Sequence, residues 1–204
     1  MTPIIGSPID RLLTLSLFLS AGLTLVSSVL YAANGWDDGT AAGVQIIGGV
    51  LGALVAVRIA TYLDRVPRLA AVALLLGMAG CGGVVGYGFN TIAVGLGGAD
   101  LIDATGAAAV LKPLGLFWPL AVLLLGIGLL RARRVPLVCG LGITVAALAY
   151  PVSRIGNIAW LAVAVDVVLL ICLAAIPFVL REDTVDAVDA PGLDAPGLGA
   201  SSTT

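Results

Sequence analysis

The chain contains no histidine among its 204 residues, and this absence excludes several common chemistries. Bis-histidine haem ligation, histidine-based zinc sites and Ser-His catalytic triads all require an imidazole ring. The three cysteines, Cys81, Cys139 and Cys172, lie singly within apolar runs and form no CxxC pair. Thiol exchange and cysteine metal clusters are therefore not expected either, and small apolar core residues are the simpler interpretation. The sequence predicts neither a cofactor nor a metal site.

Charged residues are also scarce, at 11% of the chain, while hydrophobic residues make up 60%. Soluble domains contain about 25% charged and about 45–50% apolar residues. The mean hydropathy is +1.13. No continuous basic patch suggests a nucleic-acid partner. This composition excludes an ordinary soluble domain and predicts an integral membrane protein whose principal partner is the lipid bilayer.

Six apolar runs occupy most of the sequence. A hydrocarbon core of ~30 Å needs about 20 apolar residues per helix. The runs are 12–33, 41–63, 69–90, 113–130, 135–152 and 157–180. We predict an all-α membrane protein, a bundle of six transmembrane helices formed by residues 1–180. The first run is interpreted as a retained helix, because it is longer than the 7–15 apolar residues of a cleaved signal peptide.

Short connections between these runs limit how the helices are arranged. The first and second runs, the fourth and fifth, and the fifth and sixth are each separated by only a few residues. Each of these pairs is therefore predicted to form antiparallel neighbours.

Basic residues are distributed unevenly between the two ends of the predicted bundle. With the N-terminus inside, eight lie on or near the inner side and two on the outer side. Cytoplasmic loops of membrane proteins carry such an excess of Arg and Lys. We therefore predict that both termini are cytoplasmic. Nine Arg to one Lys in an Ala- and Gly-rich chain suggest a bacterial source, and so a plasma (inner) membrane location is predicted. The inner set is Arg11, Arg58, Arg65, Arg68, Arg131, Arg133, Arg134 and Arg181, and the outer set is Lys112 and Arg154.

The two longest segments outside the apolar runs are residues 91–112 and 181–204. Residues 91–112 are too polar to span a membrane and too apolar for a plain solvated linker. They are predicted to be interfacial or re-entrant, with Asp103 or Thr105 capping a short Ala-rich helix. Residues 181–204 are acidic and rich in small residues, and contain DAPGL twice. They are predicted to form a disordered cytoplasmic tail, either solubilising or docking a partner.

Small residues predict where the helices approach one another closely. In the second run, Ala42, Gly49 and Ala56 recur every seven residues, and Gly48 and Gly52 form a GxxxG pattern beside them. Without a hydrophobic driving force in lipid, helices associate through such faces. The third run contains six glycines within twelve residues, from Gly77 to Gly88. That density suits close packing, helix bending or a ligand lying against the backbone.

Asp166 is the principal candidate for a functional site, because ionisable residues inside a membrane are costly and are usually retained for function. It lies nine residues into the sixth run, a depth of about 13.5 Å near the midplane. Thr144 and Thr24 lie at similar depths and are candidate partners. Arg58 is the second intramembrane charge, but it lies about 12 Å deeper than Asp166 and can reach the inner surface. Two interpretations of Asp166 therefore remain open: it is either a ligand or proton site, or a hydrogen-bonded structural residue.

Polar residues lie between Asp166 and the predicted outer surface. They predict a polar vestibule that opens outward and closes in mid-membrane, because leucines follow Asp166 on its inner side. The vestibule candidates are Gln45, Tyr87, Asn90, Tyr150, Arg154 and Asn157.

Three functions are compatible with these features. The principal prediction is a non-enzymatic accessory or sensor subunit of a membrane assembly, whose partner is another membrane protein or a second copy of this chain. The alternative is a small transporter or binding protein for an amphiphile or cation, with Asp166 as its protonatable site. A third reading is an enzyme acting on lipid head groups through the DxxD pair Asp100 and Asp103. No catalytic residue is assigned.

Overall fold

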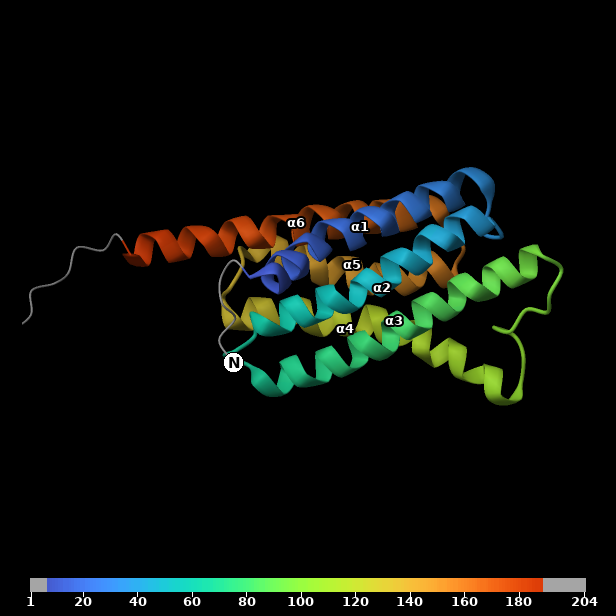
Figure 1. Ribbon diagram of the computed structural model, residues 1–204, viewed down its shortest axis with the longest axis horizontal. Coiled ribbons are helices and arrows are strands. Elements are labelled where there is room, and N and C mark those ends of the chain that lie inside the picture. The colour runs from blue at the N-terminus through green and yellow to red at the C-terminus, as the bar shows by residue number, and fades with distance from the viewer. Residues whose placement is uncertain (1–6, 189–204) are drawn as a thin grey trace, which may run out of the picture.

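The computed structural model describes the backbone of residues 7–188 and the side chains of residues 7–179. These residues form helices and connections, with no strand in this range. Six helices are long and apolar enough to cross a membrane, as predicted from the sequence (Figure 1). They are α1 (Pro8–Asn34), α2 (Gly39–Thr61), α3 (Pro67–Gly95), α4 (Leu111–Ala132), α5 (Leu137–Ile155) and α6 (Ala159–Val188), and a short 3-10 helix, η1 (Gly106–Val110), precedes α4.

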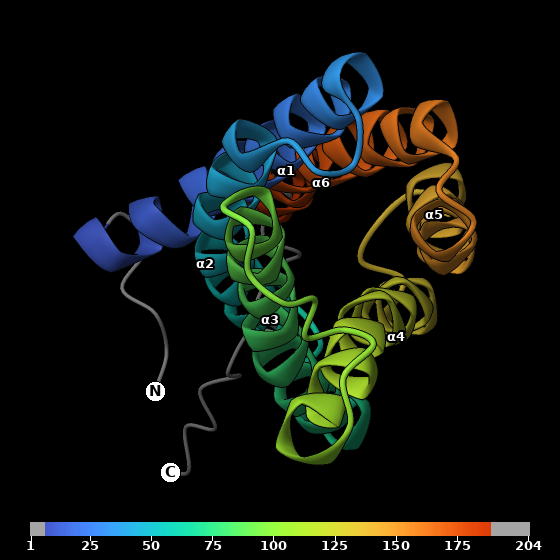
Figure 2. The same ribbon diagram turned by 90° about the vertical axis from the view of Figure 1, so that its right-hand side faces the viewer.

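The six helices form a closed ring. Each packs against its neighbours in chain order, and α6 packs against α1, as the view along the bundle in Figure 2 shows. The antiparallel pairs expected from short connections are confirmed, and α3 and α4 are also neighbours in spite of their long connection. The α1–α2, α3–α4 and α5–α6 connections lie at one end, here called the pocket end. The α2–α3 and α4–α5 connections and the start of α1 lie at the other, here called the arginine end.

Local capping explains where two of the helices begin. At α1 the Ser7 hydroxyl accepts a hydrogen bond from the Asp10 backbone N–H at 3.1 Å, and Pro8 occupies the first turn. At α2 the Asp38 carboxylate accepts one from the Thr40 N–H at 2.8 Å. Each side chain satisfies a donor that the first helical turn leaves unpaired.

The observed boundaries of α5 and α6 correct those expected from sequence. Pro151 lies inside α5, which continues to Ile155 and so carries Arg154 in its last turn. Helix α6 begins at Ala159 and runs to Val188, so the first part of the expected disordered tail, residues 181–188, is helical. The rest of that predicted tail, residues 189–204, lies outside the described residues.

The α3–α4 connection is held to the pocket end by Asn90. The Asn90 amide donates to the Asp100 carboxylate at 2.9 Å and accepts from the Leu101 N–H at 2.8 Å. The Ala-rich helix expected before Lys112 is present as η1, which leads into α4. Thr105 occupies the N-cap position of η1, as one of the two expected caps, but its side chain makes no capping hydrogen bond. The other candidate, Asp103, instead pairs with Lys112.

Helix α2 packs between α1 and α3 through its small residues. A Cβ atom added at Gly49 would lie 3.0 Å from a Val84 methyl carbon on α3, whereas one at Gly48 would lie 3.3 Å from the Thr24 hydroxyl oxygen on α1. On the α1 side, the Ser20 hydroxyl donates to the Gly48 carbonyl oxygen at 2.9 Å. The small-residue faces predicted on α2 are therefore confirmed as contact surfaces.

Helices α3 and α4 touch backbone to backbone. A Cβ atom at Gly80 would lie 2.3 Å from the Trp118 backbone nitrogen, and one at Gly83 would lie 2.4 Å from the Leu114 carbonyl carbon. Only glycine fits at these two positions without moving a helix axis. A Cβ atom at Gly82, on the outer face of the same helix, would meet no atom within 4 Å.

We therefore predict that Gly80→Ala or Gly83→Ala lowers the free energy of unfolding by about 3 kcal/mol, the upper range for overpacking, since rigid backbone obstructs the methyl group. Gly82→Ala is the matched control and should be neutral or slightly stabilising, because alanine favours helix. Unfolding of the purified protein in mixed micelles measures the difference. Equal stabilities for the three variants would contradict the backbone contact.

Candidate functional site

A cavity of about 880 Å³ opens at the pocket end of the ring. Side chains from α1 to α5 and from all three connections at this end form its walls. The vestibule residues expected from sequence all line it, namely Gln45, Tyr87, Asn90, Tyr150, Arg154 and Asn157.

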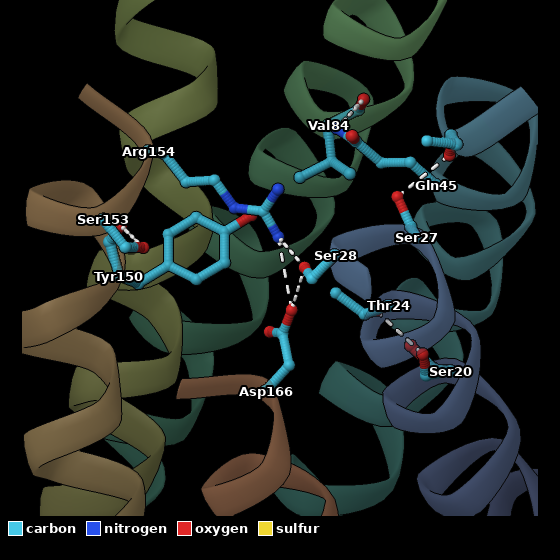
Figure 3. Close-up of polar contacts among 11 residues, drawn as sticks. Ser20, Thr24, Ser27, Ser28, Gln45, Val84, Tyr150, Ser153, Arg154 and Asp166 are labelled. Carbon is cyan, nitrogen blue, oxygen red and sulfur yellow. Dashed lines mark hydrogen bonds and ion pairs between the residues drawn. The ribbon is translucent and has the colours of Figure 1, made fainter. Parts of the chain in front are cut away.

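Arg154, one of the residues that line this cavity, belongs to a buried charged cluster (Figure 3). Asp166 on α6 is 1% exposed, and its Oδ2 atom lies 3.2 Å from Nη2 of Arg154 on α5. The same Arg154 nitrogen donates to the Ser28 hydroxyl on α1 at 2.6 Å. Ser28 in turn donates to Asp166 Oδ2. Three helices therefore meet at a single carboxylate oxygen.

The positions of the helix ends explain why these residues meet. Ser28 lies about 9 Å and Asp166 about 10.5 Å from the pocket-end termini of their helices, at a rise of 1.5 Å per residue. The sequence count gave Asp166 about 13.5 Å because it began the sixth helix at residue 157 rather than at Ala159. Arg154 lies almost at the terminus of α5, and its long side chain extends inward from there.

Aromatic rings surround the arginine. The Arg154 guanidinium carbon lies 5.5 Å from the Trp36 ring centroid and 5.3 Å from that of Tyr150. Tyr31 stacks on Trp36 with a centroid separation of 5.2 Å. Cation–π contacts of this kind orient a guanidinium group while leaving its N–H donors available.

The arginine and aspartate do not satisfy each other fully. Only Nη2 of Arg154 takes part in the hydrogen bonds of the cluster. The Arg154 Nε and the Asp166 Oδ1 are buried without a partner. An Arg–carboxylate pair commonly uses two parallel hydrogen bonds, so this one retains unused capacity on both sides.

The other residues proposed as partners of Asp166 lie elsewhere, which corrects the sequence interpretation. Thr144 donates to the Gly140 carbonyl oxygen and Thr24 to the Ser20 carbonyl oxygen, both at 2.8 Å. Each hydroxyl is therefore satisfied within its own helix, a common arrangement for threonine.

Arg58 likewise belongs to a different cluster. Its guanidinium group contacts the Asp10 carboxylate at 2.7 Å and the Thr14 hydroxyl at 3.0 Å. It also lies over the Tyr62 ring, 4.8 Å from the centroid. This cluster joins the start of α1 to the end of α2 at the arginine end, and so Arg58 is not the counter-ion of Asp166.

Sequence reasoning missed three members of the site. Ser28 follows Thr24 by four residues and therefore shares its helix face. With the sixth helix starting at Ala159, the count of depth would have selected Ser28 rather than Thr24 as the partner of Asp166. Trp36 lies in a short connection and Tyr31 in an apolar run, and no sequence pattern marks either as facing a cavity.

The acidic residues at the cavity mouth have separate partners. Asp100 accepts from the Asn90 amide, and Asp103 pairs with Lys112 at 2.9 Å, with both side chains of that pair exposed. Between residues 7 and 179, whose side chains the structure describes, no three His, Cys, Asp or Glu side chains gather as a metal site would require. The two carboxylates of the DxxD pair therefore bind different partners.

No protein-family model, curated protein or solved structure matches this chain. The case for function therefore depends on the cavity and its charged cluster.

We predict that Arg154→Gln lowers the free energy of unfolding by about 3–5 kcal/mol, because it leaves the Asp166 carboxylate buried and unpaired. The double variant Arg154→Gln/Asp166→Asn removes both charges and should recover most of this loss. Unfolding of each purified variant in mixed micelles measures both changes in free energy.

The exposed pair supplies the control, since Lys112→Gln at the cavity mouth should leave stability unchanged within error. The contrary outcome is additivity, in which the double variant loses as much stability as the two single variants Arg154→Gln and Asp166→Asn together. The two side chains would then be energetically independent, contrary to this assignment.

Proposed function

We propose that the protein is a membrane-embedded binding protein or small transporter for an amphiphilic molecule, which enters the cavity at the pocket end. The observation that supports this proposal is a cavity of about 880 Å³ whose wall includes Arg154, the cation of a buried charged cluster. Ligand pockets typically measure about 300–1,000 Å³ and combine apolar walls with a few polar groups.

The cavity walls fit such a ligand. Val84, Val94, Leu116 and Ile155 provide apolar surface. Arg154 retains 18% exposure of its side chain toward this space. A purely structural ion pair would need no such access. Asp166 beneath it remains the candidate protonatable group.

An accessory or sensor subunit is the competing proposal. Such a subunit requires a stable partner chain, but it does not require a cavity lined by the cation of a buried charge pair. We therefore rank binding or transport of a small molecule above it.

Retention of a small molecule tests this choice. Native mass spectrometry of the protein, purified from its own host in mild detergent, should find a reproducible small-molecule adduct. Val94→Trp fills part of the cavity and should remove the adduct, whereas Val72→Trp on the exposed face of α3 should retain it. A stoichiometric second protein chain without an adduct would favour the accessory subunit instead.

We further propose that the protein lies in the plasma membrane with its pocket end outside and both termini in the cytoplasm. The arginine end carries Arg11, Arg65, Arg68, Arg131, Arg133 and Arg134, whereas the pocket end carries Lys112 and Arg154. The excess of basic residues in cytoplasmic connections supports this orientation.

Two matched cysteine substitutions test the orientation. In a variant whose native cysteines are replaced by alanine, Thr105→Cys is exposed at the pocket end and Thr61→Cys is exposed at the arginine end. A membrane-impermeant maleimide added to intact cells should label Thr105→Cys and not Thr61→Cys. Labelling of Thr61→Cys alone would reverse the proposed orientation.

A further inference from the structure

The ligand class follows from the charge of Arg154 in the cavity wall, and this step rests on the proposed binding function. We propose that Arg154 binds the anionic head group of the amphiphile, a carboxylate or a phosphate, and that Asp166 takes up one proton as the head group replaces it.

Arg154 has free hydrogen-bonding capacity for such a group. Its Nη2 atom makes the contacts to Ser28 and Asp166, and its Nε atom is buried without a partner. The side chain also lines the cavity. Guanidinium groups bind carboxylates and phosphates through two parallel N–H donors, a geometry that the single-oxygen contact to Asp166 does not use.

The distribution of charge along the cavity favours this orientation of the ligand. Arg154 lines the cavity and contacts Asp166, which lies about 10.5 Å from the pocket-end terminus of α6. At the mouth, Lys112 is already paired with Asp103, and Asp37 and Asp100 add further negative charge. A cationic head group would be attracted to the mouth but repelled by Arg154. An anionic head group gains its only strong attraction at Arg154.

Replacement of Asp166 leaves a buried carboxylate without its cation, which is unfavourable in an apolar environment. Uptake of one proton from water converts this carboxylate into a neutral carboxyl group, and no other bond or electron changes. The net charge of the cluster is then the same before and after binding. Proton uptake and anion binding are therefore linked at this site.

Few charged or titratable groups lie near Asp166 that could take up the proton in its place. Among the described elements, α6 packs only against α1 and α5. Helix α1 contributes the Ser28 hydroxyl, and α5 contributes Arg154 and the more distant Tyr150. Ser28 can donate to the carboxylate or accept from the neutral acid, so it can hold either form in place.

Calorimetric titration of the full-length protein with probes of one chain length tests the proposal. Octanoate and octyl phosphate carry anionic head groups, whereas octanol and octylammonium carry neutral and cationic ones. Both anions should bind roughly tenfold or more tightly than octanol, a difference of about 1.4 kcal/mol. Repeating the octanoate titration in two buffers of different ionisation enthalpy should reveal uptake of about one proton per ligand, the linkage argued above.

Three variants separate this role from a structural one. Asp166→Asn frees Arg154, so octanoate should bind roughly tenfold more tightly and without proton uptake. Arg154→Gln/Asp166→Asn removes both charges and should abolish the preference for anions over octanol. Arg131→Gln, an exposed arginine at the opposite end, should bind as the wild type does. A merely structural Asp166 would give weaker binding in the first variant.

The outcomes distinguish this inference from the proposed function. Tighter binding of octylammonium or octanol would overturn the anionic head group while leaving the binding function intact. Octanoate binding without proton uptake would overturn the exchange at Asp166. Equal affinity for acetate or inorganic phosphate would overturn the amphiphile and make a free anion the ligand. No binding of any probe, with no adduct in native mass spectrometry, would overturn both proposals.

Discussion

The contact among Arg154, Asp166 and Ser28 is the interaction on which the closed ring depends at its pocket end. It joins α5, α6 and α1, and so ties the last two helices of the chain to the first. Buried charges are stable only when paired and hydrogen-bonded. The aspartate therefore restricts which faces α5 and α1 can turn toward α6, a restriction that apolar packing alone would not impose.

The cavity widens between α3 and α4, which approach each other most closely away from the pocket end. Gly80 and Gly83 bring α3 into backbone contact with α4, whereas the larger side chains Tyr87 and Leu111 separate the same helices nearer the pocket end. Figure 1 shows the two helix axes diverging in that direction. Small residues at the crossing and large ones beyond it thus open a space, and residues from the connections complete its walls.

Charged side chains have different roles at the two ends of the bundle. At the arginine end, the Arg58–Asp10 pair and the Arg134–Asp64 pair, each at 2.7 Å, join neighbouring connections and helix ends. At the pocket end, Arg154 instead extends into the bundle and lines the cavity, which Arg58 and Arg134 do not. This contrast is the physical basis for assigning a binding role to one cluster and a structural role to the other.

Several features of the protein were determined by sequence alone, because they depend on local composition and spacing. Six apolar runs of sufficient length predicted six helices, short connections predicted their pairing, and the repeat of Ala42, Gly49 and Ala56 predicted a contact face on α2. Asp166 stood out because few ionisable residues interrupt these runs. The polar residues at one end predicted which side chains would surround a cavity.

Only the tertiary structure decided the partners of Asp166. A helix rises 1.5 Å per residue and turns by about 100°, so an error of two residues in a boundary changes both the depth and the facing direction of a side chain. The sequence count therefore selected Thr144 and Thr24, whereas the helices bring Ser28 and Arg154 to the carboxylate. Arg154 adds the reach of a long side chain, which the position of its backbone does not reveal.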